Sequence, residues 1–190
     1  MLLLVGLGNP GSNYTNTRHN IGFKIIDAIN AHFKLSKQKP KFKGLLTTGN
    51  IDEKKIYAIK PLTFMNNSGT AIKELIDYFK IDAKDVFVFH DDLDIDFGKI
   101  KAKFGGSSAG HNGIESIDKF IGKAYSRVRI GIGHPKQKKK VNNHVLEDFK
   151  EDEEEKINEI TENIVKQLPT LIGKKIDLFS SKVNQDLNGI

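Results

Sequence analysis

The chain contains no cysteine. Disulfide bonds, thiolate metal sites and a cysteine nucleophile are therefore excluded, and the absence fits a reducing cytoplasm, where we expect the protein to act. No apolar run approaches the roughly 18 residues that a membrane-spanning helix needs, so we expect no membrane association. The apolar start, residues 1–5, lacks a basic leading region and a small-residue cleavage site. It predicts a first strand rather than a signal peptide.

Charge is unevenly spread over the 190 residues, whose net charge is +6. Residues 147–155 hold seven acidic residues and one lysine, so the rest of the chain is more basic than the total suggests. Lysines cluster at 34–43, 99–103 and 136–140. Such clusters are typical of a protein with a polyanionic partner, although the same composition also fits an ordinary solvated surface.

The hydrophobic pattern predicts strands that alternate with amphipathic helices. Strands are expected at 2–7, 44–50, 55–60, 86–90, 100–104 and 127–133. Helices are expected at 22–33, from 67–68 to 79, at 114–121, from about 151 until Pro169 kinks or ends it, and at 176–183. Residues 134–146 show no period and predict a loop. Without a repeat, a linker or a second core, residues 1–190 are expected to form a single α/β domain, a three-layer α/β/α fold with a twisted mixed central sheet.

Residues 6–11 satisfy the pattern G-x-G-x-x-G directly after the first strand. A dinucleotide site would need a helix to start at the third glycine and an acidic residue about 20 positions later, after a second strand. Here a polar, turn-forming stretch follows Gly11, and the helix is expected about ten residues too late. Asn9 instead follows the first strand, at the end of the sheet where open α/β folds bind ligands, and its amide can donate to a carbonyl oxygen.

Three further polar clusters follow predicted elements: KPLTFMNNSG at 60–69, FHDDLD at 89–94 and GGSSAGHNG at 105–113. Together with GLGNPGSNYTNTRHNIGF near the start and RVRIGIGHP at 127–135, they closely resemble the bacterial peptidyl-tRNA hydrolase family, in the same order and at the same separations. The resemblance runs from about Leu4 to Val183. These motifs in series over nearly the whole chain make it highly specific.

The resemblance implies an esterase without metal or cofactor, which cuts the bond between a peptide's C-terminal carbonyl and the terminal ribose of tRNA. By likeness to the family, His19 is the general base that takes a proton from water, and Asp91 accepts a hydrogen bond from the other ring nitrogen. Asn9, Asn66 and Asn112 match amides that hold the peptide and the water and meet the developing oxyanion.

Other positions also match the family pattern. Met65 and Tyr14 match residues beside the site, although core filler and a half-buried ring are ordinary alternatives for them. His111 fits either a hydrogen bond near the site or a helix start. The family has Glu more often at Asp92, and residues 107–109 lie in a loop that varies among its members.

The resemblance also implies how the tRNA is held. Lys101 and Lys103 alternate on one face of a strand, and with Arg129 on another strand they match basic residues that grip the 5′ end of the acceptor stem beside the CCA end. Contacts to phosphate position an RNA without reading its sequence. The lysine run at 136–140 resembles the family's mobile lid, and the family suggests a monomer.

Three alternatives to this interpretation are a metal site, a binding protein without catalysis and a covalent mechanism. His90, Asp91, Asp92 and Asp94 are residue types that bind a hard metal, although alternate residues at a strand end point to opposite faces. A non-catalytic tRNA- or ribosome-binding protein would share the basic face but leave the His, Asp and Asn set without purpose. A covalent mechanism lacks a motif, since neither cysteine nor a G-x-S-x-G sequence is present.

Overall fold

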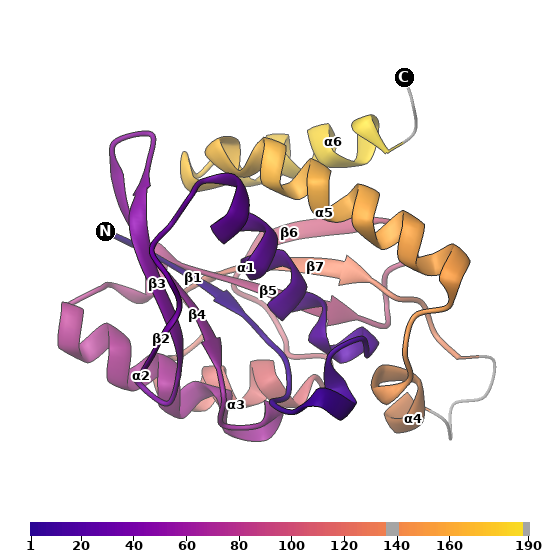
Figure 1. Ribbon diagram of the computed structural model, residues 1–190, viewed down its shortest axis with the longest axis horizontal. Coiled ribbons are helices and arrows are strands. Elements are labelled where there is room, and N and C mark those ends of the chain that lie inside the picture. Colours follow the sequence, from indigo (N-terminus) through magenta and orange to yellow (C-terminus); the bar gives the residue numbers. More distant parts are fainter. Residues whose placement is uncertain (136–140, 188–190) are drawn as a thin grey trace.

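The computed structural model describes residues 1–135 and 141–187. Its centre is one seven-stranded sheet with the strand order β2-β3-β4-β1-β5-β7-β6 (Figure 1). The strands are β1 (Leu2–Gly6), β2 (Lys39–Lys41), β3 (Gly44–Ile51), β4 (Lys54–Pro61), β5 (Val86–Asp92), β6 (Ile100–Phe104) and β7 (Ser126–Gly131). The four central strands β4, β1, β5 and β7 are parallel, and β2, β3 and β6 pair antiparallel to their neighbours. The mixed sheet confirms the predicted fold class.

Helices cover both faces of the sheet (Figure 1). The helices α1 (Ile21–His32), α5 (Glu151–Ile172) and α6 (Ile176–Asp186) lie on one face, and α2 (Ser68–Phe79) and α3 (Asn112–Ile121) lie on the other. Side chains of β1 alternate between the two cores, because successive residues of a strand point to opposite faces. The result is the expected three layers.

The start of α1 packs backbone to backbone against the sheet at two glycines. A Cβ on Gly22 would collide with the backbone of Leu7 and Phe89, and a Cβ on Gly6 would collide with the carbonyl of Gly22. This close approach fixes the residues just before α1 over the carboxyl ends of β1 and β5. In an open parallel sheet, that is where ligands bind.

The structure corrects three local predictions. Residues 141–146 form a short helix, α4 (Val141–Leu146), where a loop was expected. The helix α5 continues through Pro169 to Ile172, since a proline in the last turn removes only one backbone hydrogen bond. The edge strand β2 was not predicted, because its sequence Lys-Pro-Lys has no apolar signal. The lysine run 136–140, for which the resemblance implies a lid, lies outside the described residues.

The two edge strands of the sheet are protected in different ways. On β6, the backbone N–H groups of Ile100 and Ala102 donate to the side chains of Asn184 and Ser180 on α6, at 3.0 and 2.8 Å. On the opposite edge, β2 carries Pro40 between two exposed lysines. In the part of the chain that the structure describes, no helix is both long enough and apolar enough to cross a bilayer.

Candidate active site

His19 and Asp91 meet at the carboxyl end of the sheet. Asp91 is the sixth residue of β5, and His19 lies in a short 3₁₀ helix, η2 (Arg18–Asn20), directly before α1. The His19 Nδ1 atom lies 2.8 Å from Oδ1 of Asp91. Because a carboxylate only accepts hydrogen bonds, Nδ1 carries the proton, and Nε2 keeps its lone pair in the neutral ring. The pair can therefore abstract a proton from a bound molecule.

His111 donates to the same carboxylate oxygen. Its Nδ1 accepts hydrogen bonds from the backbone N–H groups of Gly113 and Ile114, so this ring caps the start of α3. The cap leaves Nε2 as the protonated nitrogen of the neutral ring, and Nε2 lies 3.0 Å from Oδ1 of Asp91. Both roles left open for His111 in the sequence are filled at once.

Burial and charge act in opposite directions on this cluster. Burial disfavours the charged imidazolium of His19, but attraction to Asp91 and the hydrogen bond with it outweigh burial and raise the pKa of His19. Burial would raise the pKa of Asp91, yet the charges and hydrogen bonds of His19 and His111 hold it well below its usual range. Asp91 is thus ionised, and it favours a proton on His19 once that proton has been taken up.

The amide of Asn9 is held in one orientation. Its backbone N–H and C=O pair with the side chain of Asn20 at 2.8 and 2.9 Å, and its Oδ1 accepts from the backbone N–H of Met65 at 2.8 Å. Among these groups, the Nδ2 donor of Asn9 is the one left for a ligand. Asn20 precedes α1, and its side chain holds Asn9 instead of capping that helix.

His19 and the three predicted amide residues line the same cleft, which has a volume of about 450 Å³. Asn9, Asn66 and Asn112 line it together with Met65, and the residues that close it are Phe64, Asn142, Val145 and Leu146. Met65 is buried, and it both lines the cleft and belongs to the hydrophobic core on the α2 side of the sheet. Tyr14 does not line this cleft; its ring meets the edge of Phe64 with centroids 6.4 Å apart, so it supports the rim. His19 and Asp91 also line a smaller adjoining cavity of about 210 Å³, which extends toward Asp92.

The three predicted tRNA contacts lie side by side beyond Asp92. Lys101 on β6 pairs in register with Arg129 on β7, and Lys103 follows two residues along the same face. Arg129 Nε donates to Oδ2 of Asp92 at 2.7 Å, which joins this basic group to the end of β5. Burial and the positive charges of Arg129 and Arg127 lower the pKa of Lys103. Crowded cations of this kind attract an anion.

The acidic segment has a partner that the sequence did not reveal. The buried Arg18, next to His19, donates to Oε2 of Glu153 at 2.8 Å and to the backbone carbonyls of His144 and Glu147. Its guanidinium also lies 5.5 Å from the centre of the Phe149 ring. These contacts fasten the segment that carries α4 to the base of the cleft. The sequence could not predict these contacts of Arg18, because they depend on how η2 packs against residues 144–153 in three dimensions.

The metal-ligand set considered in the sequence does not assemble. Asp92 faces Arg129, Asp94 pairs with His134, and the Nδ1 of His90 bonds to the carbonyl of Asp91. In residues 1–135 and 141–187, a different group has the spacing of a metal site: ligand atoms of His19, Asp91 and His111 lie within 4.8 Å of one another. A cation there would have to displace two protons, one from His19 and one from His111, which these rings donate to Asp91.

Comparisons with known proteins identify close relatives. The family model described as "Peptidyl-tRNA hydrolase" matches residues 3–189. A curated protein of that name from Pelagibacter ubique (strain HTCC1062) is 72% identical over 184 residues, which is 97% of this chain and 99% of the relative. A second, from Bradyrhizobium sp. (strain ORS 278), is 42% identical over 97% of this chain and 92% of its own length. The crystal structure of peptidyl-tRNA hydrolase from Acinetobacter baumannii superposes with a TM-score of 0.91 at 34% identity, covering 97% of this chain and 94% of that one.

Proposed function

The chain belongs to the peptidyl-tRNA hydrolase family and hydrolyses peptidyl-tRNA, and we propose that His19 is its general base, with Asp91 as the group that orients it. The observation that carries this proposal is the 2.8 Å contact between His19 Nδ1 and Asp91 Oδ1, which leaves Nε2 as the basic nitrogen beside a cleft lined by amides. Membership of a hydrolase family favours this reading over a non-catalytic tRNA-binding protein.

In the proposed reaction, water attacks the carbonyl carbon of the ester while Nε2 of His19 takes one of its protons. Asp91 stabilises the imidazolium that forms, and its fixed carboxylate holds the ring in the tautomer that the step needs. When the tetrahedral intermediate collapses, the bond to the ribose oxygen breaks and the imidazolium returns the proton to that oxygen. The products are a peptide with a free carboxyl group, which then loses its proton to water, and a tRNA with a free hydroxyl.

The amides are proposed to stabilise the charge that develops on the carbonyl oxygen. Asn9 is best placed for this role, because its backbone and its Oδ1 are already held and little reorganisation is needed when charge appears. Asn66 and Asn112 line the same cleft and are proposed to bind the peptide and the water. One preorganised donor of this kind contributes about 10²- to 10³-fold to the rate.

Lys101, Lys103 and Arg129 are proposed to contact phosphates at the acceptor stem, with the CCA end entering the cleft. The basic group borders Asp92, and Asp92 lines the cavity next to His19. Contacts to phosphate alone suit an enzyme that acts on tRNAs of different sequence. We further propose that the protein is a cytoplasmic monomer built as one domain, which sedimentation of the purified chain would test for its oligomeric state.

The test of the proposed base compares the wild type with His19→Ala on an N-acetyl-aminoacyl-tRNA. Loss of the base should lower kcat by about 10²- to 10⁴-fold, while the affinity for tRNA stays within about twofold. His32→Ala is a matched control, because His32 is exposed at the end of α1 and away from the cleft. Turnover by His19→Ala at the wild-type rate would reject the proposal.

A further inference from the structure

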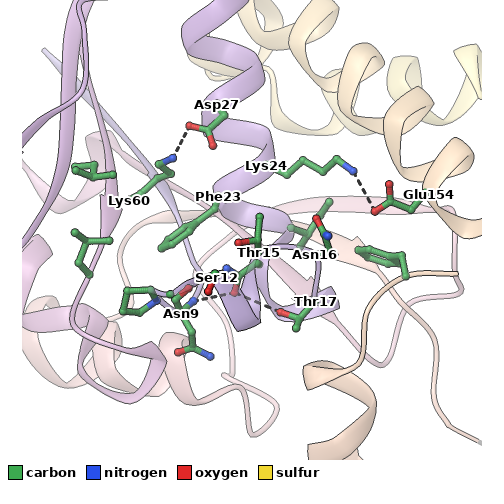
Figure 2. Close-up of a pocket in the computed structure, with 17 residues that line it drawn as sticks. Asn9, Ser12, Thr15, Asn16, Thr17, Phe23, Lys24, Asp27, Lys60 and Glu154 are labelled. Carbon is green, nitrogen blue, oxygen red and sulfur yellow. Dashed lines mark hydrogen bonds and ion pairs between the residues drawn. The ribbon is translucent and has the colours of Figure 1, made fainter. Parts of the chain in front are cut away.

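A third cavity, of about 600 Å³, adjoins the candidate active site at Asn9, and its other lining residues have no part in the reaction described above. We call it the α1 pocket, because α1 forms its floor between the loop after β1, the start of β3, the end of β4 and the start of α5 (Figure 2). Its apolar lining consists of Ile21, Phe23, Leu45, Leu62 and Phe149, with Pro10 on the loop. A cavity of this size is in the range that binds small ligands and peptide segments.

The charged groups of the α1 pocket neutralise one another. Lys60 is buried, and its ammonium group contacts Asp27 at 2.5 Å. Lys24 lies 3.6 Å from Glu154, and Figure 2 shows this pair on the α5 side of the pocket. Since each cation that lines the pocket already has a carboxylate, the pocket offers no uncompensated charge. It therefore favours an uncharged, apolar occupant, because a charged side chain would lose hydration without gaining a partner.

The α1 pocket and the catalytic cleft share a wall. Asn9 lines both, and Leu62 of the pocket is followed two residues later by Phe64 of the cleft rim. Hydrogen bonds with Asn20 and Met65 hold Asn9 in its position between the pocket and the cleft. A molecule whose carbonyl lies beside His19 and Asn9 can extend from the cleft past Asn9 into the pocket.

The strand order decides which half of the substrate extends that way. The reacting ester joins a tRNA to a peptide, and the proposed phosphate contacts lie on β6 and β7. His19 and Asp91 lie over β1 and β5, which stand between β4 on one side and β7 and β6 on the other. The α1 pocket is built on β3 and β4, on the other side of the ester. If the tRNA lies on the β6–β7 side of the ester, the peptide extends toward the β3–β4 side, where the α1 pocket lies.

We propose that the α1 pocket binds uncharged, apolar residues of the peptide that lie N-terminal to the esterified residue. This inference rests on the proposed function, since it needs the ester at His19 and the tRNA on the β6–β7 side. It adds a preference for peptide sequence to an enzyme whose contacts to tRNA carry none. The hydroxyl and amide groups of Ser12, Thr15 and Asn16 line the loop side of the pocket, where they can bond to the peptide backbone (Figure 2).

The experiment compares two substrates of equal length on the wild type, N-acetyl-tetrapeptidyl-tRNAs that share the esterified residue. One carries three leucines before that residue and the other carries three aspartates. The leucine substrate should show a kcat/KM about tenfold higher, mainly through KM, since burying one apolar side chain is worth at least that factor. Equal kcat/KM values for the two substrates would overturn the proposal.

A variant that fills the pocket locates the preference. Leu62→Trp places a larger ring at a partly exposed position of the lining, and it should lower the ratio between leucine and aspartate substrates by about fivefold or more. Leu178→Trp is the matched control, because Leu178 is 44% exposed on α6 against 38% for Leu62, and it should keep the wild-type ratio. A wild-type ratio in Leu62→Trp would also overturn the proposal.

Two measurements separate this proposal from the proposed function. N-acetyl-leucyl-tRNA has no residue upstream of the ester, so its hydrolysis tests His19 without the α1 pocket. If the wild type hydrolyses it and His19→Ala does not, the base stands whatever the peptide ratio is. Free N-acetyl-tetraleucine should inhibit wild-type turnover competitively, and the aspartate peptide should not. Equal inhibition by both peptides would count against the pocket without requiring any variant to fold.

Discussion

His19 and Asp91 are 72 positions apart in the chain, and their side chains form a 2.8 Å hydrogen bond. Parallel pairing of β1 with β5 brings them together, because the loop after β1 and the end of β5 then meet at the same edge of the sheet. Gly22 adds the second requirement, since its lack of a side chain lets the start of α1 lie on the backbone of Leu7 and Phe89. The reactive pair thus depends on how α1 packs on the sheet.

The pH dependence of turnover should report the charge of Asp91. Only the neutral imidazole accepts a proton, so wild-type kcat/KM should rise as pH increases through the pKa of His19. Because Asp91 raises this pKa, the rise should lie at higher pH than for a free imidazole. In Asp91→Asn, burial remains without the opposing charge, so the acidic limb should move to lower pH while the plateau falls by about 10²- to 10⁴-fold. A pH–rate profile of both proteins checks this. An acidic limb that stays in place would mean that Asp91 does not set the pKa of His19.

Two substitutions of His111 should separate its two roles. His111→Ala removes both the cap of α3 and the donor to Asp91, so stability should fall by about 1 kcal/mol and kcat by about tenfold. Asparagine is a good N-cap but cannot reach Asp91 as the imidazole does. His111→Asn should therefore keep the stability of the wild type and still lower kcat by about tenfold. Urea denaturation and steady-state kinetics give the two readouts, and full turnover in His111→Asn would limit His111 to capping.

The salt dependence of tRNA binding should identify phosphate contacts. Replacing Lys101 or Lys103 by alanine should weaken binding and reduce the slope of log K against log salt by about one unit per lost contact. Lys73→Ala is the control, because Lys73 is exposed on α2 and paired with Asp77. A slope unchanged from the wild type would remove the substituted lysine from the interface.

Glu153 should be worth more to stability than its position on a polar helix start suggests. Glu153→Ala leaves the buried guanidinium of Arg18 with only the exposed carboxylate of Glu147, 3.7 Å away, and removes the acceptor of the Lys150 N–H at the start of α5, which together should cost about 3 kcal/mol. Glu159→Ala, on the same helix but in an exposed pair with Lys156, should cost less than about 1 kcal/mol. The free energies of unfolding in urea compare the two, and equal costs would show that the Arg18 pair is solvated.

The sequence predicted the elements whose signals are local. Apolar runs located β1 and β5, and the 3.6-residue period located α1 and α5, because these patterns follow from which side faces the core. The helix α4 was missed, since its six residues have no periodic apolar face and are held by contacts with Arg18. Edge strand β2 exists only through its pairing with β3, which no local pattern reveals.

The candidate site was predictable as a list of residues but not as an arrangement. The resemblance to a family supplied His19, Asp91 and the amides, and these residues lie together in the structure. The dual use of His111 and the clamp of Asn20 on Asn9 could not be predicted, because they depend on which atom faces which across distant segments. Tyr14 contacts Phe64 on the rim of the cleft, and its part in substrate binding stays a prediction.

The protection of the two edge strands should limit the pairing of this sheet with strands of other molecules in a concentrated solution. Exposed strand edges recruit strands from other chains, which is a common start of aggregation. The outer N–H groups of Ile100 and Ala102 are taken by α6, and Pro40 denies a visiting strand one of its hydrogen bonds between two repelling lysines. The sheet is therefore complete at seven strands, and intermolecular strand addition is blocked at both ends.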